Sequence, residues 1–296
     1  MLSIGCDFHS RYQQIAMYDQ TTAEITERRL DHLNGEAQQF YRSLTGPVRV
    51  AVEATGSLTW FERLLAELGH ELWIGDAAKI RASAVRKQKT DQRDARLILS
   101  LLLEERFPRL WVPSPDNRDL RQLLWHRHKL VTLRTLLRNQ LHFLALGQGL
   151  CRKSRLFTRP GRIELQSLSL GPWASRRRTE LLKLLDQLAP SITELDRAVL
   201  TQAQQQDDAA RLMTHPGIGP VSALAFVLVV GPVERFRRSK QLVSYLGLNP
   251  SEHSSGGNSV SGPSASRVTP WCAGCWWKLR IRWCGTIRSF VVTICI

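Results

Sequence analysis

Long apolar runs are missing from this sequence of 296 residues. No stretch approaches the roughly 18 consecutive apolar residues that a membrane-spanning helix needs, and the N-terminus does not join a basic segment to a long apolar one. These absences argue against a membrane partner and predict a cytoplasmic protein. Aromatic residues are also scarce, at 7%, while a hydrophobic content of 43% fits a globular protein with buried cores.

Cysteine is too sparse and too unevenly placed for a disulfide framework. Cys272 and Cys275 have CxxC spacing, but Cys284 and Cys295 do not complete any usual zinc pattern. These four cysteines, together with four of the nine tryptophans, fall in the last 26 residues. The composition of the chain therefore changes abruptly near its end.

Acidic residues are in short supply, with 26 against 41 basic ones and a net charge of +15. Between Lys79 and Arg162 stand 20 basic and 6 acidic residues, a difference of +14. Charge concentrated in this way favours a nucleic-acid partner over a solvated helix face or an anionic membrane. We expect contacts to nucleic acid from Lys87, Lys89, Arg93, Arg127, Lys129, Arg134 and Arg138.

The first hundred residues have an α/β pattern. Apolar and β-branched runs predict strands at 2–7, 12–18, 24–30, 48–54 and 71–76, with helices near 35–44 and 58–68. This order indicates a mixed sheet covered by helices.

Helical periodicity dominates from Asp94 onward. We expect helices at 94–107, at 116–146 and over 179–206, the last one restarting at Ser191, where Glu194 completes a capping box after Pro190. Helices of this length indicate a bundle or a coiled-coil arm.

A glycine-rich turn, "HPGIGP", precedes the apolar helical run that begins near residue 220. Gly217 and Gly219 would expose backbone N–H groups at a helix start, which suits phosphate binding. An ordinary turn between two helices explains the same residues.

Four carboxylates occupy positions that suit a metal site. Asp7 and Glu53 end two predicted strands, and ligands of open sheets bind beyond the carboxyl ends of strands. Asp91 and Asp94 stand three residues apart in "KTDQRDARLIL", on one helix face. Helix capping is the alternative, with Asp91 as the N-cap of a variant capping box. If this helix docks at the sheet edge, all four acids converge.

The negative charge of such a cluster must be neutralised by bound cations, because neighbouring carboxylates raise one another's pKa. Two Mg²⁺ ions about 4 Å apart would neutralise it and would assist displacement at a phosphorus atom. All-oxygen ligands favour Mg²⁺ over Zn²⁺. We therefore expect Asp7, Glu53, Asp91 and Asp94 to be catalytic metal ligands.

These motifs resemble the Asp-Glu-Asp-Asp signature of the DEDD insertion-sequence transposases, known as bridge-RNA-guided recombinases. The resemblance rests on Asp7 after the first strand, on "VEATG", on "KTDQRDAR" and on the stretch from "HPGIGP" to "SSGG", and it covers residues 1 to about 257. It implies an α/β N-terminal domain of the RuvC-like, ribonuclease H fold, a long helical or coiled-coil region and a mostly helical C-terminal transposase domain. The corresponding ranges are 1–105, 106–213, 214–257 with the PGIG turn and a serine loop, and a tail at 258–296.

The resemblance also implies a mechanism and partners. Ser255, in the "PSEHSSGG" stretch, matches the serine that attacks DNA covalently, and a metal or base must activate its hydroxyl. The implied partners are DNA, a structured guide RNA and further copies of the chain in a dimer or tetramer. Active sites would then combine the first domain of one subunit with the serine domain of another.

The tail after Gly257 departs from the family pattern. Codons for the stretch from Gly262 can be chosen so that, read two bases later, they encode a continuation typical of the family. We therefore hypothesise a frameshift near residue 258 that replaces a C-terminal helix. Two other functions remain open, a junction nuclease that uses water with Ser255 passive, and a catalytically inactive nucleic-acid-binding remnant.

Overall fold

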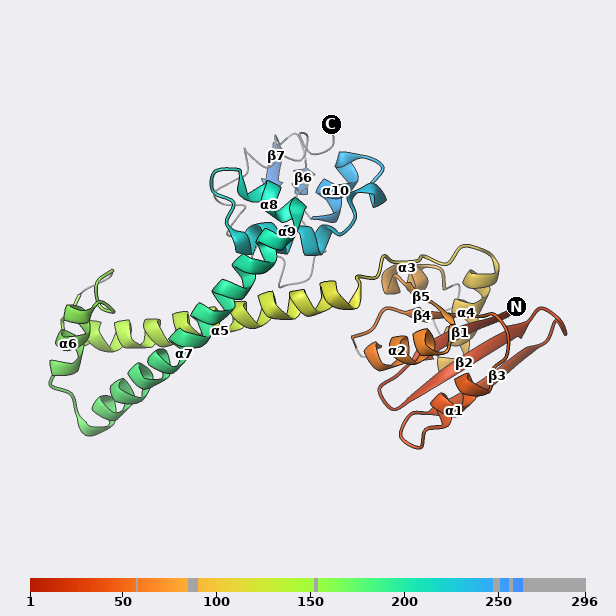
Figure 1. Cartoon of the computed structure of the whole chain (residues 1–296), viewed down its shortest axis with the longest axis horizontal. Coiled ribbons are helices and arrows are strands. Elements are labelled where there is room, and N and C mark those ends of the chain that lie inside the picture. Colours follow the sequence, from red (N-terminus) through yellow and green to blue (C-terminus); the bar gives the residue numbers. More distant parts are fainter. Residues whose placement is uncertain (57, 85–89, 152–153, 247–250, 256–257, 263–296) are drawn as a thin grey trace. The chain divides into compact units, whose positions relative to one another are not determined.

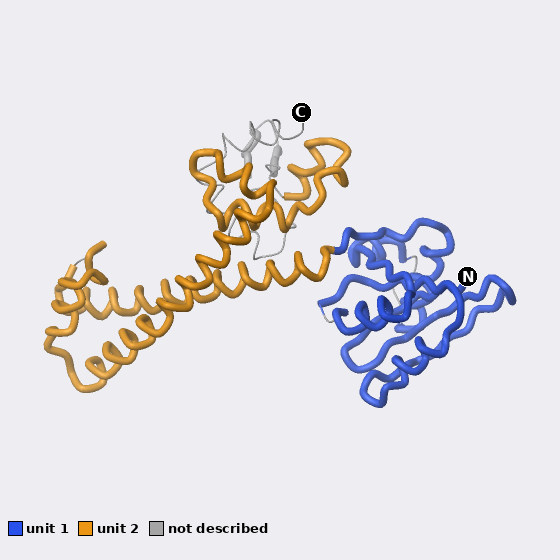
Figure 2. Tube along the Cα trace, in the orientation of Figure 1, with its two compact units in different colours: residues 1–112 blue, residues 113–296 orange. Residues whose placement is uncertain are grey.

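The computed structural model describes residues 1–56, 58–84, 90–151, 154–246, 251–255 and 258–262. The chain divides into two compact units, Met1–Val112 and Pro113–Ile296 (Figure 2). Within the described residues the first unit holds a five-stranded sheet and its covering helices, and the second is mostly helical (Figure 1).

The sheet of the first unit is mixed. Its order is β3-β2-β1-β4-β5, with β2 antiparallel to β1 and β3, and with β4 parallel to β1 and β5. The strands are β1 (Leu2–Phe8), β2 (Tyr12–Asp19), β3 (Ile25–Asp31), β4 (Val48–Glu53) and β5 (Glu71–Gly75). The predicted mixed sheet is confirmed, and each strand matches its predicted range to within one residue at either end.

Helices cover both faces of this sheet (Figure 1). Helices α1 (Glu36–Ser43) and α2 (Thr59–Glu67) pack on one face, where Tyr41 and Phe61 join a core with Ile4, Val50 and Val52. Helix α4 (Asp91–Leu103) packs on the other face, where its Ala95 and Leu99 contact Ala16 of β2. A short helix, α3 (Ala77–Ala82), follows β5.

Gly5 allows α4 to lie directly on β1. A Cβ atom at this position would be 2.4 Å from both the carbonyl oxygen of Ala95 and the backbone nitrogen of Leu99, so no larger residue fits without moving the helix. Side chains alternate between the faces of a strand, so Gly5 and Asp7 share the face that α4 covers. The contact therefore fixes the helix on the same face as Asp7.

Thr90 is the N-cap of α4, and the predicted capping box with Asp91 at the cap is wrong. The Thr90 backbone is extended, and its hydroxyl accepts a hydrogen bond from the backbone N–H of Arg93 at 3.4 Å. Because the cap lies one residue earlier, Asp91 and Asp94 both stand in the first helical turn. Negative charge is favourable there, beside the positive end of the helix dipole.

Two long helices form an antiparallel hairpin in the second unit. They are α5 (Pro115–Leu146) and α7 (Pro172–Gln205), joined through α6 (Arg159–Ser167). Leu141 of α5 shares a core with Leu182 of α7, while Leu124 near the start of α5 shares another with Val199 near the end of α7. The predicted helical region is present, and its coiled-coil character stays a prediction.

Helix α7 runs through Pro190, so the predicted restart at Ser191 is wrong. Proline removes one backbone donor, but the helix is held on both sides by burial of Leu185 and Ile192. The Thr193 hydroxyl also donates a hydrogen bond to the Ala189 carbonyl oxygen at 2.9 Å. Apolar packing along the hairpin therefore outweighs the helix-breaking tendency of Pro190.

After α7 the described residues form α8 (Asp207–Met213), α9 (Pro220–Val230), a 3₁₀ turn η1 (Val233–Arg235), α10 (Ser239–Tyr245) and the hairpin of β6 (Ser251–Ser255) with β7 (Asn258–Gly262). The apolar helix α9 shares a core with Leu212 of α8 and another with Leu242 of α10. Ser255, predicted in a loop, is the last residue of β6 and pairs with Asn258. Among the helices in the described ranges, none has the length and apolar character needed to cross a bilayer.

Candidate functional site

Asp7 lies at the end of β1, next to the end of β4. The parallel register pairs Cys6 with Val52, so the next residues along the two strands are Asp7 and Glu53. The Asp7 side chain is only 14% exposed. Burial raises the pKa of Asp7, the nearby His9 lowers it, and the carboxylates of Asp94 and Asp91 raise it further. Asp7 is therefore a carboxylate whose negative charge lacks full compensation.

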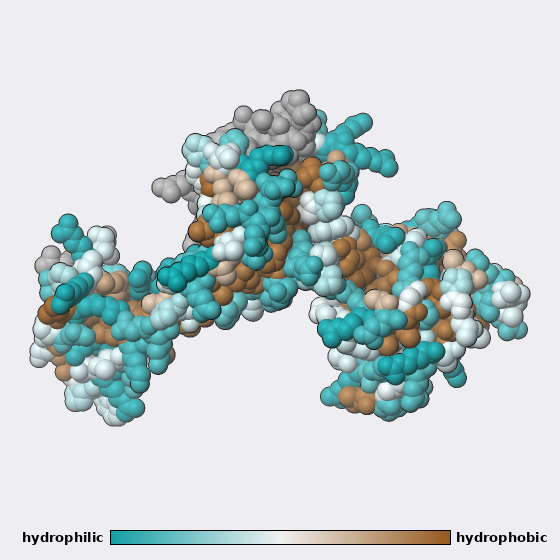
Figure 3. All heavy atoms as spheres, viewed as in Figure 1, coloured by the Kyte–Doolittle hydropathy of each residue, from teal (hydrophilic) through white to brown (hydrophobic). Residues whose placement is uncertain are grey.

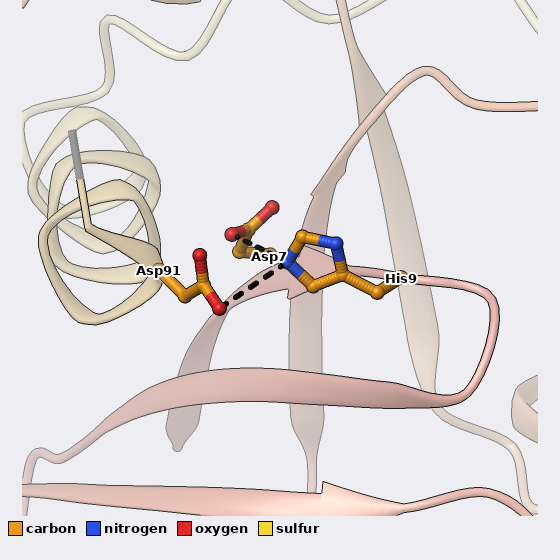
Figure 4. A group of neighbouring side chains, drawn as sticks. All are labelled: Asp7, His9 and Asp91. Carbon is orange, nitrogen blue, oxygen red and sulfur yellow. Dashed lines mark hydrogen bonds and ion pairs between the residues drawn. The ribbon is translucent and has the colours of Figure 1, made fainter.

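His9 joins Asp7 to the first turn of α4 (Figure 4). Its Nε2 atom lies 3.1 Å from Oδ2 of Asp7 and 3.6 Å from Oδ2 of Asp91. Ligand atoms of these three residues all lie within 4.8 Å of one another. The sequence prediction missed His9, although a histidine two residues after a strand-end aspartate points to the same face and was the available signal.

Tyr12 is a second residue that the sequence prediction missed. Its hydroxyl donates a hydrogen bond of 2.8 Å to Oδ2 of Asp91, and this bond raises the pKa of Tyr12. The ring lies 4.6 Å from the His9 ring, between centroids. The contact joins residues 79 positions apart, so no local pattern could reveal it.

Glu53 has a different partner in this structure. Its Oε1 atom lies 3.3 Å from Nη2 of Arg81, and the arginine side chain is 74% exposed. Glu53 follows Val52 at the end of β4, but it is not among the three residues whose ligand atoms lie within 4.8 Å of one another. An exposed ion pair contributes little free energy, so a divalent cation could displace Arg81 at small cost.

The donor set fits a divalent cation. Carboxylate oxygens suit Mg²⁺ and Mn²⁺, and an imidazole nitrogen suits transition metals. Burial and the charges of Asp94 and Asp91 raise the pKa of Asp7 and so disfavour its ionised form, and a bound cation would offset these penalties. Asp7, His9 and Asp91 could hold the ion. Asp94 lies in the same helical turn as Asp91, and its charge acts on Asp7.

The basic residues predicted to contact nucleic acid lie in both units. Lys87 and Lys89 fall outside the described residues, and Arg93 is exposed on α4. On α5, Arg127 pairs with Asp196 at 2.5 Å, and the Lys129 ammonium lies 5.1 Å from the Trp125 ring centroid. Figure 3 shows hydrophilic residues over much of the visible face of the hairpin formed by α5 and α7.

Arginines of the hairpin also repel one another. Partial burial and then the charges of Arg134 and Arg162 lower the pKa of Arg138. The Arg138 guanidinium stacks on Phe157, 5.0 Å from its ring centroid. An anion bound here would relieve this repulsion.

The glycines of the PGIG turn lie between α8 and α9. Gly217 has a φ of +88°, a left-handed conformation that favours glycine, and Gly219 is the residue before α9. The Gly219 carbonyl oxygen accepts the backbone N–H of Ala223, which closes the first turn of α9. The turn therefore has the predicted position, and its phosphate binding stays a prediction.

Comparison with protein families matches two parts of the chain. A transposase model for IS110-type DEDD proteins matches residues 4–146, and a model described as "Transposase IS116/IS110/IS902 family" matches residues 209–270. The first match contains Asp7, Glu53, Asp91 and Asp94, and the second contains Ser255.

Curated relatives carry related descriptions. The chain is 28% identical to a "Probable family 20 transposase" of Pseudomonas aeruginosa, covering 89% of this chain and 78% of that one. It is 28% identical to the "Transposase for insertion sequence element IS1111A" of Coxiella burnetii, covering 71% and 59%. It is 27% identical to a "Pilin gene-inverting protein" of Moraxella bovis, covering 74% and 61%. The chain thus spans less than two thirds of the last two relatives.

Proposed function

The chain belongs to the IS110 family of insertion-sequence transposases, and we propose that it recombines DNA for a mobile element. One observation supports this function most strongly. The strand-end Asp7 and the helix-start Asp91, distant in sequence, lie within reach of one cation, with Asp94 in the same helical turn. Acids in this order match the family signature from which the sequence prediction started.

The proposed reaction is phosphoryl transfer assisted by Mg²⁺. Asp7, Glu53, Asp91 and Asp94 would hold a pair of ions, which stabilise negative charge on the phosphate oxygens and on the leaving oxygen when bound. The protein supplies the rest. The β1 and β4 ends fix two carboxylates, and the Gly5 contact sets the first turn of α4 against them.

Ser255 is the proposed nucleophile. Its Oγ atom would form a bond to phosphorus while the bond from phosphorus to a deoxyribose oxygen of the DNA breaks. The serine proton passes to a carboxylate or water, and the departing oxygen takes up a proton. The proposal is supported by the family match over this stretch, in which Ser255 is the last residue of β6 and pairs with Asn258 of β7.

Nucleic acid would bind the basic surface of α5 and its neighbours. The charges of Arg134 and Arg162, which disfavour the charged form of Arg138, support this assignment, since bound phosphates would offset them. The family resemblance adds a structured guide RNA as partner, and a homo-oligomer in which one copy's carboxylates serve another copy's serine.

A recombination assay tests the function. It contains donor and target DNA, Mg²⁺ and the non-coding RNA encoded beside the gene, and it compares this chain with a version in which the downstream reading frame is restored. We expect the restored protein to recombine. Gene sequencing that finds no intact downstream frame would refute the frameshift hypothesis. That hypothesis concerns residues 258–296, of which 263–296 lie outside the described ranges.

Two matched aspartate substitutions make this assay specific to the proposed metal site. Asp91 and Asp116 each stand in the first turn of a helix, but only Asp91 belongs to the metal group. We expect Asp91→Asn to abolish recombination and Asp116→Asn to retain it. Recombination by the Asp91→Asn protein would contradict the proposal. Nucleic-acid binding without recombination in every version would identify an inactive remnant.

A further inference from the structure

The Tyr12 side chain contacts Asp91 from β2, the strand that neighbours the β1 strand of Asp7. Tyr12 is the first residue of β2, and its hydroxyl donates to Oδ2 of Asp91 at 2.8 Å. A carboxylate offers about four lone-pair sites, so this bond uses one and leaves others able to bind a cation. A hydrogen bond to one oxygen also restricts rotation of the carboxylate and so favours one orientation of Asp91 toward Asp7.

Arg29 holds the ring of Tyr12 in turn. Its guanidinium carbon lies 3.9 Å from the ring centroid, which is a close cation–π contact. Arg29 comes from β3, Tyr12 from β2, Asp91 from α4 and Asp7 from β1. Three neighbouring strands and the covering helix therefore meet in one chain of contacts that ends at the proposed cation site.

The fold does not depend on this hydroxyl. Helix α4 is already seated by its contact with Gly5 and by the buried side chains of Ala95 and Leu99. Tyr12 is only half-buried, and its hydroxyl meets the helix at the first turn. The bond is therefore placed to orient a side chain and not to anchor the helix.

We propose that Tyr12, braced by Arg29, is a positioning residue that orients the Asp91 carboxylate for a divalent cation. This inference rests on the proposed function, because it assigns the cation to Asp7 and Asp91. Residues that orient metal ligands through hydrogen bonds contribute strongly to affinity, and their loss commonly weakens metal binding 10-fold or more.

Tyr18 provides a matched control. It lies on the same strand and the same face as Tyr12, and it packs beside Ala16, Ala95 and Leu99. Tyr18→Phe and Tyr12→Phe each remove one hydroxyl from β2, but only Tyr12→Phe removes a bond to Asp91. Arg29→Gln keeps the hydroxyl and removes the guanidinium stacked on the ring.

The experiment measures Mn²⁺ binding to the full-length protein by electron paramagnetic resonance, with thermal unfolding recorded in EDTA. We expect the Tyr12→Phe protein to bind Mn²⁺ about 10-fold more weakly than wild type. Tyr18→Phe should stay within about 2-fold, and Arg29→Gln should fall between them. The melting temperature without metal should be the same for Tyr12→Phe and Tyr18→Phe.

Two results would overturn the inference. One is equal Mn²⁺ affinity in the Tyr12→Phe and Tyr18→Phe proteins. The other is a weaker affinity that is matched by a lower melting temperature in EDTA, since that would give Tyr12 a structural role. A third result would refute the proposed cation site itself: wild type binds no Mn²⁺, or binds it as tightly as the Asp91→Asn protein does. This result distinguishes failure of the proposed site from failure of the role given to Tyr12.

Discussion

Asp7→Asn is expected to stabilise the metal-free protein while removing its response to metal. Burial and the charges of Asp94 and Asp91 raise the pKa of Asp7, so its ionised form is disfavoured in the folded state. Asparagine keeps the shape of the side chain without the charge. The substitution therefore removes a repulsion that the wild-type protein contains whenever no cation is bound.

The size of the effect follows from the geometry. Two unit charges about 5 Å apart repel by about 1.7 kcal/mol at an effective dielectric constant of about 40. The Asp91 side chain is 43% exposed, so solvent screening reduces this to about 1 kcal/mol. Loss of the contact between His9 and Asp7 offsets part of the gain. A net gain of about 0.5–1 kcal/mol should raise the melting temperature of the first unit by about 2–4 °C.

Thermal unfolding in EDTA measures the stability without metal, and thermal unfolding in Mg²⁺ measures the stabilisation that the ion provides. At a free ion concentration of about 10 times Kd, wild type should gain about 1.4 kcal/mol, and Asp7→Asn should gain none. The order of stability should therefore reverse between the two conditions. An Asp7→Asn protein that is less stable than wild type in EDTA, or that responds equally to Mg²⁺, would refute the reasoning.

The same prediction has a dependence on pH with a definite sign. Because the pKa of Asp7 is raised in the folded state, that state holds more protons than the unfolded chain between the ordinary and the raised pKa. The penalty from Asp7 is complete above the raised pKa and vanishes below the ordinary one. The advantage of Asp7→Asn over wild type in EDTA should accordingly shrink as the pH falls through this window.

Three further predictions concern other parts of the chain. Ser255→Ala should abolish a covalent protein–DNA adduct, whereas retained strand exchange would favour a junction nuclease that uses water. Replacing Arg134 and Arg138 by Gln should lower the slope of log K against log salt for nucleic-acid binding by about 1.8, and an unchanged slope would exclude both from phosphate contact. Gly5→Ala should destabilise the first unit by about 2–3 kcal/mol in thermal unfolding, because its Cβ atom would overlap α4, while Gly56→Ala, with open space around it, should be neutral.

The sheet edge could be predicted from the sequence because its signals are local. Alternating Val48, Val50 and Val52 mark a buried strand, and parallel strands in adjacent positions bring their carboxyl ends together. Because β1 and β4 are expected as neighbours, the sequence predicts Asp7 and Glu53 at the same edge of the sheet. The spacing of Asp91 and Asp94 likewise fixed their common helical turn.

The details that the sequence did not reveal depend on contacts between distant segments. His9 and Tyr12 acquire their partners only when α4 lies on β1 and β2. Thr90, and not Asp91, is the N-cap of α4, because its backbone is extended and the helix begins at the next residue. The spacing of the two aspartates suggested the wrong cap residue. Pro190 stays inside α7 because the hairpin packing, and not local propensity, decides where that helix ends.

The most direct measurement is a crystal structure of the protein with Mn²⁺, analysed by anomalous scattering. The account predicts an anomalous peak about 2.0–2.3 Å from carboxylate oxygens of both Asp7 and Asp91, with Asp94 or Glu53 supplying further oxygens. A map without such a peak at saturating Mn²⁺, or with the ion bound away from these two residues, would contradict the central claim.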